Sequence, residues 1–332
     1  MKKLFLIAIL ITSGTLFAQP KFSRLNDMPG AFSRMGFGAR GMGMGNAMSA
    51  VTEGELVSYY NPALSVFQEN NSFQTSYSFL SLDRSLNFLN FTRKFDFYSK
   101  NDTGSVRTPR STAGVSIGII NSGVGKIDGR DGQGIKTGEL STSENQFFLA
   151  LANRFSRKFA LGVSIKFYYY RLYDKINANG LGLDIGAIYR LNDQWNISLM
   201  LSDLNSKYKW DSSPIYEENG TTSQDNFPLL KKIGVSYTNN KLGLIAAAEL
   251  ENSNAGTNIL RFGGEYNIYD KLYLRAGLDQ FDLSNTDTPV QPSFGFSYFK
   301  KFGNITAGVN YAFVIEPYSP QDRHVAGLSF NF

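Results

Sequence analysis

Apolar side chains alternate with polar or small ones along most of the chain after residue 72. From Leu161 to Tyr170 the odd positions are Leu, Val, Ile, Phe and Tyr, and the even positions are Gly, Ser, Lys, Tyr and Tyr. Successive side chains of a β-strand point to opposite faces, so one face of this segment is apolar and the other is mostly small or polar. That pattern is typical of a barrel strand with lipid outside and a polar lumen inside.

Segments with this alternation occur fourteen times, and most are close to the roughly 9–11 residues that a tilted strand needs to cross a bilayer. The number is even, as in single-chain bacterial barrels. The sequence therefore predicts an all-β fold, a fourteen-stranded antiparallel transmembrane β-barrel. The predicted strands are residues 73–81, 85–94, 112–120, 144–154, 159–172, 178–190, 195–204, 230–238, 242–250, 257–266, 272–282, 291–300, 304–314 and 323–332.

Short and long links alternate between these strands, as periplasmic turns and external loops do in outer-membrane barrels. The short links are residues 154–158, 191–194, 239–241, 267–271 and 301–303. The long links are residues 121–143, 205–229, 283–290 and 315–322. Residues 95–111 break the alternation, because this link is long where a short turn is expected. Either it folds over the lower rim or an early strand is misplaced.

The N-terminus has the features of a secretory signal peptide. Two lysines precede the apolar run Leu4–Ile11, and small residues lead to a predicted cleavage site after Ala18. We therefore divide the chain into a signal peptide (1–18), an N-terminal hatch or plug segment (19–71) and an outer-membrane β-barrel (72–332). The expected location is the outer membrane of a Gram-negative bacterium.

Two short motifs lie within residues 36–64. The first contains Gly38, Arg40, Gly41 and Gly43, and the second is Tyr60-Asn61-Pro62-Ala63. Here the chain resembles the PorV/PorQ family, which is itself similar to the FadL-type outer-membrane barrels. The resemblance implies a fourteen-stranded barrel whose Gly-rich N-terminal segment folds into the lumen as a hatch. The glycines suit close approach to the barrel wall, and Asn61-Pro62 suits a turn before the first strand.

The resemblance supports two functional expectations. The PorV/PorQ similarity implies a non-enzymatic component or cargo-binding adaptor of type IX protein secretion. The FadL similarity implies the alternative, a transporter that moves small hydrophobic molecules across the outer membrane. A transporter should have an apolar pocket above the hatch and a lateral exit, for which a kink at Gly263-Gly264 is a candidate. An adaptor should have a sealed lumen and a partner-binding patch on its loops. A soluble exported β-sandwich adhesin is a third possibility.

The alternation also assigns side chains to the lumen. Charged residues of both signs fall on the inward face, so pairing across a wet lumen is expected. These lumenal candidates are Lys166, Asp184, Arg190, Glu249, Arg261, Glu265, Arg275 and Asp279. Gly114 and Gly186 are small lumenal positions. In the long link 205–229 we expect Tyr208, Trp210 and Tyr216 to form the partner-binding patch.

Composition narrows the chemistry further. Cysteine is absent, so the chain has no disulfides and no thiolate metal site. The net charge of +5 is spread along the chain, which argues against nucleic-acid binding. The single histidine, His324, falls on the outward face of the last strand, where an interfacial ring is expected. We expect no cofactor, no metal and no enzymatic activity. The expected partners are outer-membrane lipid and, through the C-terminal Phe332, the barrel-insertion machinery.

Overall fold

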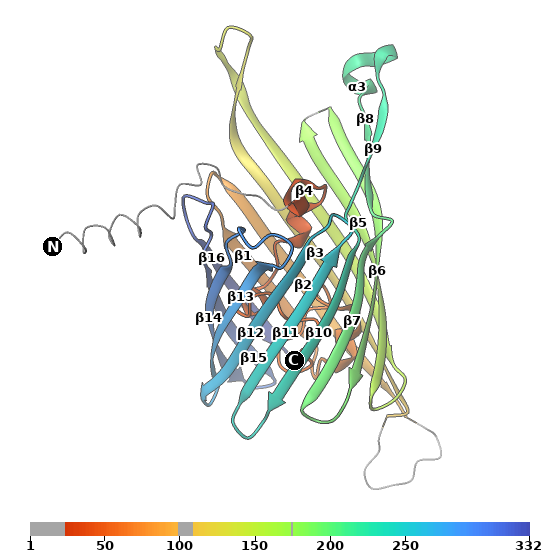
Figure 1. Ribbon diagram of the computed structural model, residues 1–332, viewed down its shortest axis with the longest axis vertical. Coiled ribbons are helices and arrows are strands. Elements are labelled where there is room, and N and C mark those ends of the chain that lie inside the picture. The colour runs from red at the N-terminus through yellow and green to blue at the C-terminus, as the bar shows by residue number, and fades with distance from the viewer. Residues whose placement is uncertain (1–23, 99–108, 174) are drawn as a thin grey trace, which may run out of the picture.

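A computed structural model describes residues 24–98, 109–173 and 175–332 of the chain. These residues form a closed antiparallel β-barrel of fourteen strands with a folded N-terminal segment inside it (Figure 1). Each strand pairs with its neighbour along the chain, except that β7 pairs with β10. Pairing of β5 with β6 and of β1 with β16 completes the ring. Within the described residues, no helix is long and apolar enough to cross a membrane.

The barrel strands and the intervening hairpin have the following bounds. They are β1 (Ser72–Phe79), β2 (Arg84–Phe97), β3 (Ser111–Arg130), β4 (Lys136–Arg154), β5 (Phe159–Tyr173), β6 (Ile176–Arg190), β7 (Trp195–Leu204), β8 (Lys207–Asp211), β9 (Thr222–Asn226), β10 (Leu230–Asn239), β11 (Leu244–Ser253), β12 (Asn258–Tyr269), β13 (Leu272–Asp282), β14 (Gln291–Phe302), β15 (Ile305–Val314) and β16 (Arg323–Asn331).

All fourteen predicted strands are present, and the fold prediction is confirmed. Two of the long links, however, are not loops. Residues 121–143 continue β3 and β4 as a paired hairpin that rises above the neighbouring strands (Figure 1), with a register irregularity between Val124 and Ile127. Residues 205–229 contain a second hairpin, β8–β9, with the short helices α3 (Ser213–Tyr216) and η4 (Glu217–Asn219) at its tip. Polar backbone groups in both segments are thus satisfied by strand pairing.

The long link between β2 and β3 does not reflect a misplaced strand. The two strands stay in register up to the pair Phe97 and Ser111, and the amide of Arg110 donates to the carbonyl of Phe97 at 2.8 Å. Residues 99–108 of this link lie outside the described residues.

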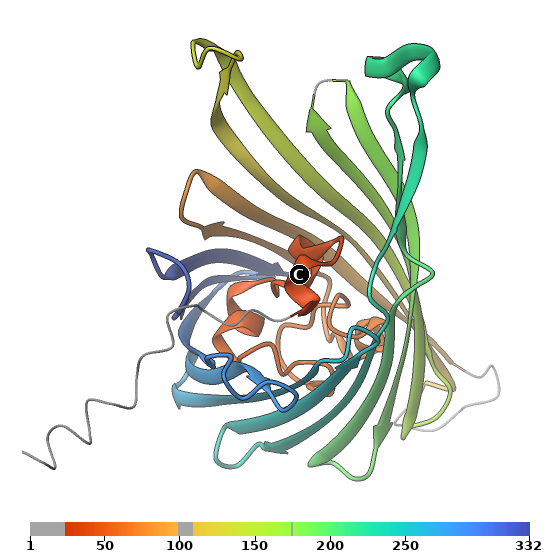
Figure 2. The same cartoon turned by 45° about the horizontal axis from the view of Figure 1, so that its top comes forward.

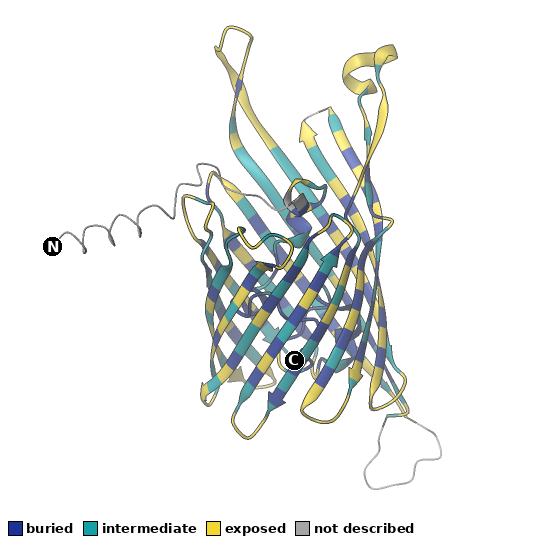
Figure 3. Ribbon diagram, viewed as in Figure 1, coloured by how far each residue is buried: buried dark blue, intermediate teal, exposed yellow. Residues whose placement is uncertain are grey.

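Exposure follows the predicted alternation (Figure 3). In β5, exposed and buried side chains alternate residue by residue from Phe159 to Tyr169. The exposed positions carry large apolar side chains, including Val163, Ile165 and Phe167. An apolar outer face and a buried inner face match a barrel that stands in lipid. His324 points outward as predicted, and its Nδ1 lies 2.6 Å from the hydroxyl of Tyr311.

Residues 24–71, which we call the lumenal segment, lie inside the barrel (Figure 2). The segment contains η1 (Arg24–Asp27), η2 (Ala31–Arg34), α2 (Ala39–Gly43) and η3 (Pro62–Phe67). Helix α2 packs against β13 to β16, and η3 packs against β2 to β6. The segment is therefore in contact with almost the whole circumference. The predicted signal peptide lies outside the described residues and stays a prediction.

Glycines in the wall make room for this packing. A Cβ atom on Gly277 of β13 would lie 2.1 Å from the amide nitrogen of Gly45, and one on Gly114 of β3 would lie 2.5 Å from the backbone of Ser65. Gly45 itself has φ +57°, a conformation that favours glycine. The backbone of the lumenal segment thus lies directly against the strands.

Candidate functional site in the barrel lumen

Arg40 joins the lumenal segment to the barrel wall. Its Nη2 and Nε donate to the two carboxylate oxygens of Glu265 on β12, both at 2.8 Å, and Arg275 on β13 donates to the same carboxylate. Its Nη1 donates to the carbonyls of Glu53 and Glu55 at 2.8 and 2.7 Å. Burial lowers the pKa of Arg40, but the carboxylate of Glu265 more than offsets this and raises the pKa overall. The buried guanidinium therefore stays charged and fully engaged.

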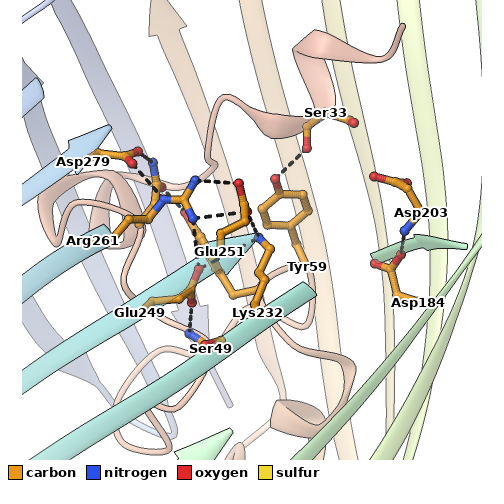
Figure 4. A network of polar contacts seen from close by, with 12 residues as sticks. Ser33, Ser49, Tyr59, Asp184, Asp203, Lys232, Glu249, Glu251, Arg261 and Asp279 are labelled. Carbon is orange, nitrogen blue, oxygen red and sulfur yellow. Dashed lines mark hydrogen bonds and ion pairs between the residues drawn. The ribbon is translucent and has the colours of Figure 1, made fainter. Parts of the chain in front are cut away.

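A second ion cluster lies on the wall beside the segment (Figure 4). Arg261 on β12 contacts Asp279 of β13 at 2.7 Å and, on β11, Glu249 at 3.2 Å and Glu251 at 3.1 Å. Lys232 on β10 contacts Glu251 at 3.0 Å. Arg261 and its three carboxylate partners are all buried. Their pairing offsets the free-energy cost of burying these charges.

A third cluster lies on β5 to β7. Lys166 contacts Asp184 at 2.7 Å and Asp203 at 3.2 Å, and the hydroxyl of Tyr168 donates to Asp203 at 2.6 Å. Arg190, also predicted to face the lumen, is half-buried and lies 3.5 Å from Glu53 of the lumenal segment. The structure thus places seven of the eight charged residues predicted for the lumen in these three clusters, and the eighth, Arg190, beside the lumenal segment.

The lumenal segment is tied to one side of the wall by polar contacts. Strands β6, β7, β10 to β14 and β16 supply most of these contacts, and β1 supplies one, from Gln74 to the carbonyl of Leu56. Hydrogen bonds outside the Arg40 cluster include Asn46 to Asp279 (2.7 Å), Ser49 N to Glu249 (3.2 Å), Ser49 with Ser198 (2.8 Å), Ser236 to Ala50 O (2.7 Å), Asn196 to Thr52 (3.1 Å) and Arg323 to Met35 O (3.2 Å).

The two sequence motifs fix the shape of the segment. Gly38 has φ +74° and precedes α2, and a Cβ atom on Gly41 would lie 2.2 Å from the Tyr60 hydroxyl. Asn61 caps η3, because its Oδ1 accepts from the amide of Ala63 at 3.0 Å, and Pro62 opens that helix. Gly43 lies close to the backbone of Gly295 on β14. A Cβ atom added to Gly43 would lie 3.4 Å from the Cα of Gly295.

The side of the lumen formed by β2 to β5 carries an apolar cluster, beside buried polar side chains such as Asn90 and Ser116. Phe37 and Tyr59 of the lumenal segment pack edge to face at 4.6 Å between ring centroids, and Phe37 stacks on Phe88 of β2 at 5.9 Å. Buried Ile120 and Phe148 belong to the same cluster. Such apolar contacts have no preferred direction, in contrast to the ion pairs that β10 to β13 form on the opposite wall.

This apolar cluster continues to the β8–β9 hairpin, which we call the outer hairpin. The ring of Tyr208 on β8 lies 4.8 Å from Phe227 and 6.3 Å from Tyr168, and Trp210 lies 5.3 Å from Tyr170. Tyr208 is only 2% exposed, so it cannot belong to the exposed partner-binding patch that we predicted. Trp210 is partly buried, and only Tyr216, in α3, is well exposed, at 62%.

The predicted kink at Gly263-Gly264 is not present. Gly263 pairs with Gly277 and Gly264 with Ala276 in unbroken register, and the irregularity lies between Leu260 and Phe262. Gly263 instead makes room for the lumenal segment, because a Cβ atom there would lie 2.3 Å from the Met44 carbonyl oxygen.

Another part of the wall is thin. A groove of about 570 Å³ crosses its outer face from β15 to β3, and a void of about 10 Å³ lies behind it against the lumenal segment. The groove and the void share the wall residues Thr75, Phe88, Asn310, Gly327 and Leu328. Gly327, on the inward face of β16, has no side chain to thicken the wall there.

Several buried side chains in the lumen have unsatisfied polar atoms, among them Gln146, Glu55, Ser58 and Asn196. Neither the Nε2 nor the Oε1 of Gln146 on β4 has a hydrogen-bond partner among the described residues, and the same holds for Oε1 of Glu55. Such groups cost about 1–3 kcal/mol each, more when charged. Burial raises the pKa of Glu55, although Ser329 and Arg275 oppose the shift. Within the described residues, no group of histidine, aspartate and glutamate side chains could hold a metal ion.

The sequence interpretation missed several members of these clusters. Lys232 has the same parity as the lumenal position Gly234, so alternation could have found it. Glu251 lies one residue beyond the predicted end of its strand. Asp203 has φ +60° at a register irregularity between β6 and β7. This conformation turns its side chain inward against the alternation, which no sequence pattern signals.

Comparison with known proteins gives no match to a protein-family model and no significant match among curated proteins. Solved structures do match. The toluene transporter TodX of Pseudomonas putida is 14% identical, with a TM-score of 0.55 over 89% of this chain and 96% of that one. A TodX monoaromatic hydrocarbon channel deltaS2S3 mutant is 15% identical, with a TM-score of 0.57 over 90% and 99%. A FadL homologue of Pseudomonas aeruginosa is 11% identical, with a TM-score of 0.52 over 89% and 97%.

At these identities the similarity concerns the fold. The matched proteins are a transporter, a channel and a FadL homologue, and the match extends over nearly the whole length of each. The chain has the fold of the FadL-type fourteen-stranded outer-membrane barrels.

Proposed function

We propose that this protein is a channel through which small hydrophobic molecules cross the outer membrane. The observation that carries the proposal is the apolar cluster of the lumen, one set of packed buried side chains that extends from the β8–β9 hairpin to the lumenal segment. A polar solute would gain nothing from such a wall, whereas an apolar one is stabilised there by about 25 cal/mol per Å² of buried surface. The fold similarity to a toluene transporter and a monoaromatic hydrocarbon channel supports the same conclusion.

In this proposal the aromatic side chains of the outer hairpin form the entrance. Tyr208, Trp210 and Phe227 pack with Tyr168 and Tyr170 of β5 at the outer end of the lumen. Aromatic rings give a large apolar contact area in a defined geometry, which suits the capture of a small apolar molecule.

The lumenal segment acts as the hatch. Its ion pairs and hydrogen bonds hold it to β6, β7, β10 to β14 and β16, whereas its contacts with β2 and β3 are mainly apolar. Apolar contacts can rearrange without leaving charges unpaired, so the segment can move on that side while it stays anchored on the other. The thin wall at Gly327 belongs to a groove that extends from β15 and β16 across β1 to β2 and β3, at the edge of this apolar side, and is our candidate for a lateral exit.

Uptake of a labelled monoaromatic hydrocarbon, such as toluene, by cells that express the protein tests this function. We expect faster uptake than in cells without it. Ala326→Trp, which fills the outer groove, should lower uptake at least about fivefold, because the exit would be blocked. Ala246→Trp, at an outward position of β11, is the matched control and should have no effect. Equal uptake with and without the protein would contradict the proposal.

A second candidate, the type IX secretion adaptor, has one observation in its favour. Tyr216 and Ile215 are exposed on α3, at the tip of the projecting hairpin, where a partner could reach them (Figure 1). None of the similar structures described above is a secretion component. Affinity purification together with a deletion strain tests this candidate. Recovery of no secretion component, with secretion retained in the deletion strain, would rule it out.

A further inference from the structure

Gln146 is the one side chain in the lumen whose whole amide is left unsatisfied among the described residues. It lies on the inward face of β4 and is completely buried. Its cross-strand neighbours are Ile120 on β3 and Tyr168 on β5, both also completely buried. The amide is therefore surrounded by the apolar cluster that we assign to the passage of substrate.

The polar groups nearest along the wall are already engaged. The hydroxyl of Tyr168 donates to Asp203 at 2.6 Å, and Glu144 accepts from the hydroxyl of Tyr208 at 3.2 Å. A comparison with Gln74 on β1 shows the contrast. That side chain is also buried and inward, but its Nε2 donates to the carbonyl of Leu56 at 3.0 Å. Buried amides normally find such partners, so the free donors and acceptor of Gln146 require an explanation.

Space for a ligand beside Tyr168 depends on the outer hairpin. The rings of Phe227 and Tyr208 lie 4.7 and 6.3 Å from the Tyr168 ring and are carried by the hairpin and the link that follows it. The hairpin pairs with β6 through two residue pairs only, Ala178–Trp210 and Asn179–Lys209. If the hairpin and this link lifted together, both rings would move away from Tyr168, the cross-strand neighbour of Gln146.

We propose that Gln146 is a specificity-determining residue of the channel, which selects apolar molecules that carry one neutral hydrogen-bonding group. This inference rests on the proposed transport of hydrophobic molecules. A hydroxyl can donate to Oε1 and a carbonyl can accept from Nε2, so such a ligand satisfies an amide that a pure hydrocarbon leaves unpaired. A carboxylate is disfavoured, because the carboxylates of Glu144, Asp184 and Asp203 outnumber the ammonium group of Lys166 on this stretch of wall.

Binding of three ligands with one carbon skeleton tests this inference. The ligands are p-cresol, p-xylene and 4-methylbenzoate, titrated at pH 7 into the purified full-length protein in detergent, with protein-free micelles as the blank. We expect the wild type to bind p-cresol at least about fivefold more tightly than p-xylene, as one net hydrogen bond provides. It should bind 4-methylbenzoate most weakly.

Gln146→Leu should bring the ratio of the two dissociation constants for p-xylene and p-cresol close to one, without lowering the unfolding temperature. Gln74→Leu is the matched control and should keep the wild-type ratio. An unchanged ratio in Gln146→Leu, a wild-type ratio near one, or tightest binding of 4-methylbenzoate would each overturn the inference while leaving the channel function in place. Failure of the wild type to bind either neutral ligand would overturn the channel function as well.

Discussion

At the scale of single residues, the lumen is held together by buried charges. Glu265 accepts hydrogen bonds from Arg40 of the lumenal segment and from Arg275 of the neighbouring strand. Removing one member of a buried ion pair leaves the partner charge without compensation in a poorly hydrated site. The free energy of unfolding should therefore depend strongly on these side chains.

Glu265→Gln should lower the free energy of unfolding by about 3–5 kcal/mol, because two guanidinium groups lose their shared carboxylate. Urea unfolding in detergent micelles measures this change. Glu139→Gln is the matched control. It removes the exposed contact with Lys136 at 3.4 Å, and such pairs are worth only about 0.2–1 kcal/mol. Equal effects of the two substitutions would show that the lumenal cluster does not anchor the segment.

Glu55 gives a pH-dependent prediction. Because burial raises its pKa above the ordinary value of 4.5, the folded protein retains a proton that the unfolded chain has already released. The free energy of unfolding should then fall as the pH rises from about 4.5 through the folded pKa. Glu55→Gln should remove this loss, so the variant should gain stability relative to wild type at pH 8 but not at pH 4.

The measurement is urea unfolding at a series of pH values, with the exposed Glu69→Gln as the control that keeps the wild-type profile. A wild type whose stability rises with pH across this window would contradict the assignment.

At the scale of elements, the lumenal segment fits the wall because several strands present glycine to it. Gly277 of β13 faces the segment. Gly264, on the neighbouring β12, faces outward, and the nearest atom to a Cβ added there would be 3.9 Å away. The same substitution at the two positions therefore separates docking of the segment from the general effect of replacing a strand glycine.

Gly277→Ala should displace the lumenal segment while the barrel still folds, because the added Cβ collides with the backbone of Gly45. We expect a larger ion conductance in planar bilayers than for wild type, and the conductance of Gly264→Ala should be unchanged. If Gly277→Ala conducts like wild type, the segment does not close the lumen.

At the scale of the whole molecule, the barrel closes where its ends meet. Strand β16 pairs with β1 along all eight residues of β1, and Phe332 exchanges backbone hydrogen bonds with Asn71 at 3.0 and 3.1 Å. The C-terminal residue thus completes the seam. In the closed barrel this residue is 52% exposed.

Phe332→Ser should reduce the amount of protein in the outer membrane several-fold, because the insertion machinery would lose its terminal aromatic signal. Phe302→Ser changes a similarly exposed ring at the end of β14 and is the control. Quantitative blotting of membrane fractions measures both variants. Equal amounts of the Phe332→Ser and Phe302→Ser variants in the outer membrane would contradict a role of Phe332 as the insertion signal.

The sequence determined the barrel. A period of two residues and a length near that of the bilayer are local properties, so all fourteen strands and the inward orientation of residues such as Lys166 and Arg261 could be predicted. The paired hairpin at residues 121–143 could not, because its polar strands lie above the apolar band and need no apolar face.

Only the tertiary structure decided which charges meet and what the lumen contains. Arg40 and Glu265 are 225 residues apart, and their contact depends on how the segment folds back into the closed barrel. The inward turn of Asp203 comes from a left-handed backbone conformation at a strand irregularity. The unsatisfied amide of Gln146 likewise arises only once three strands and the outer hairpin surround it. Such features depend on the closed ring, and alternation along one strand carries no information about them.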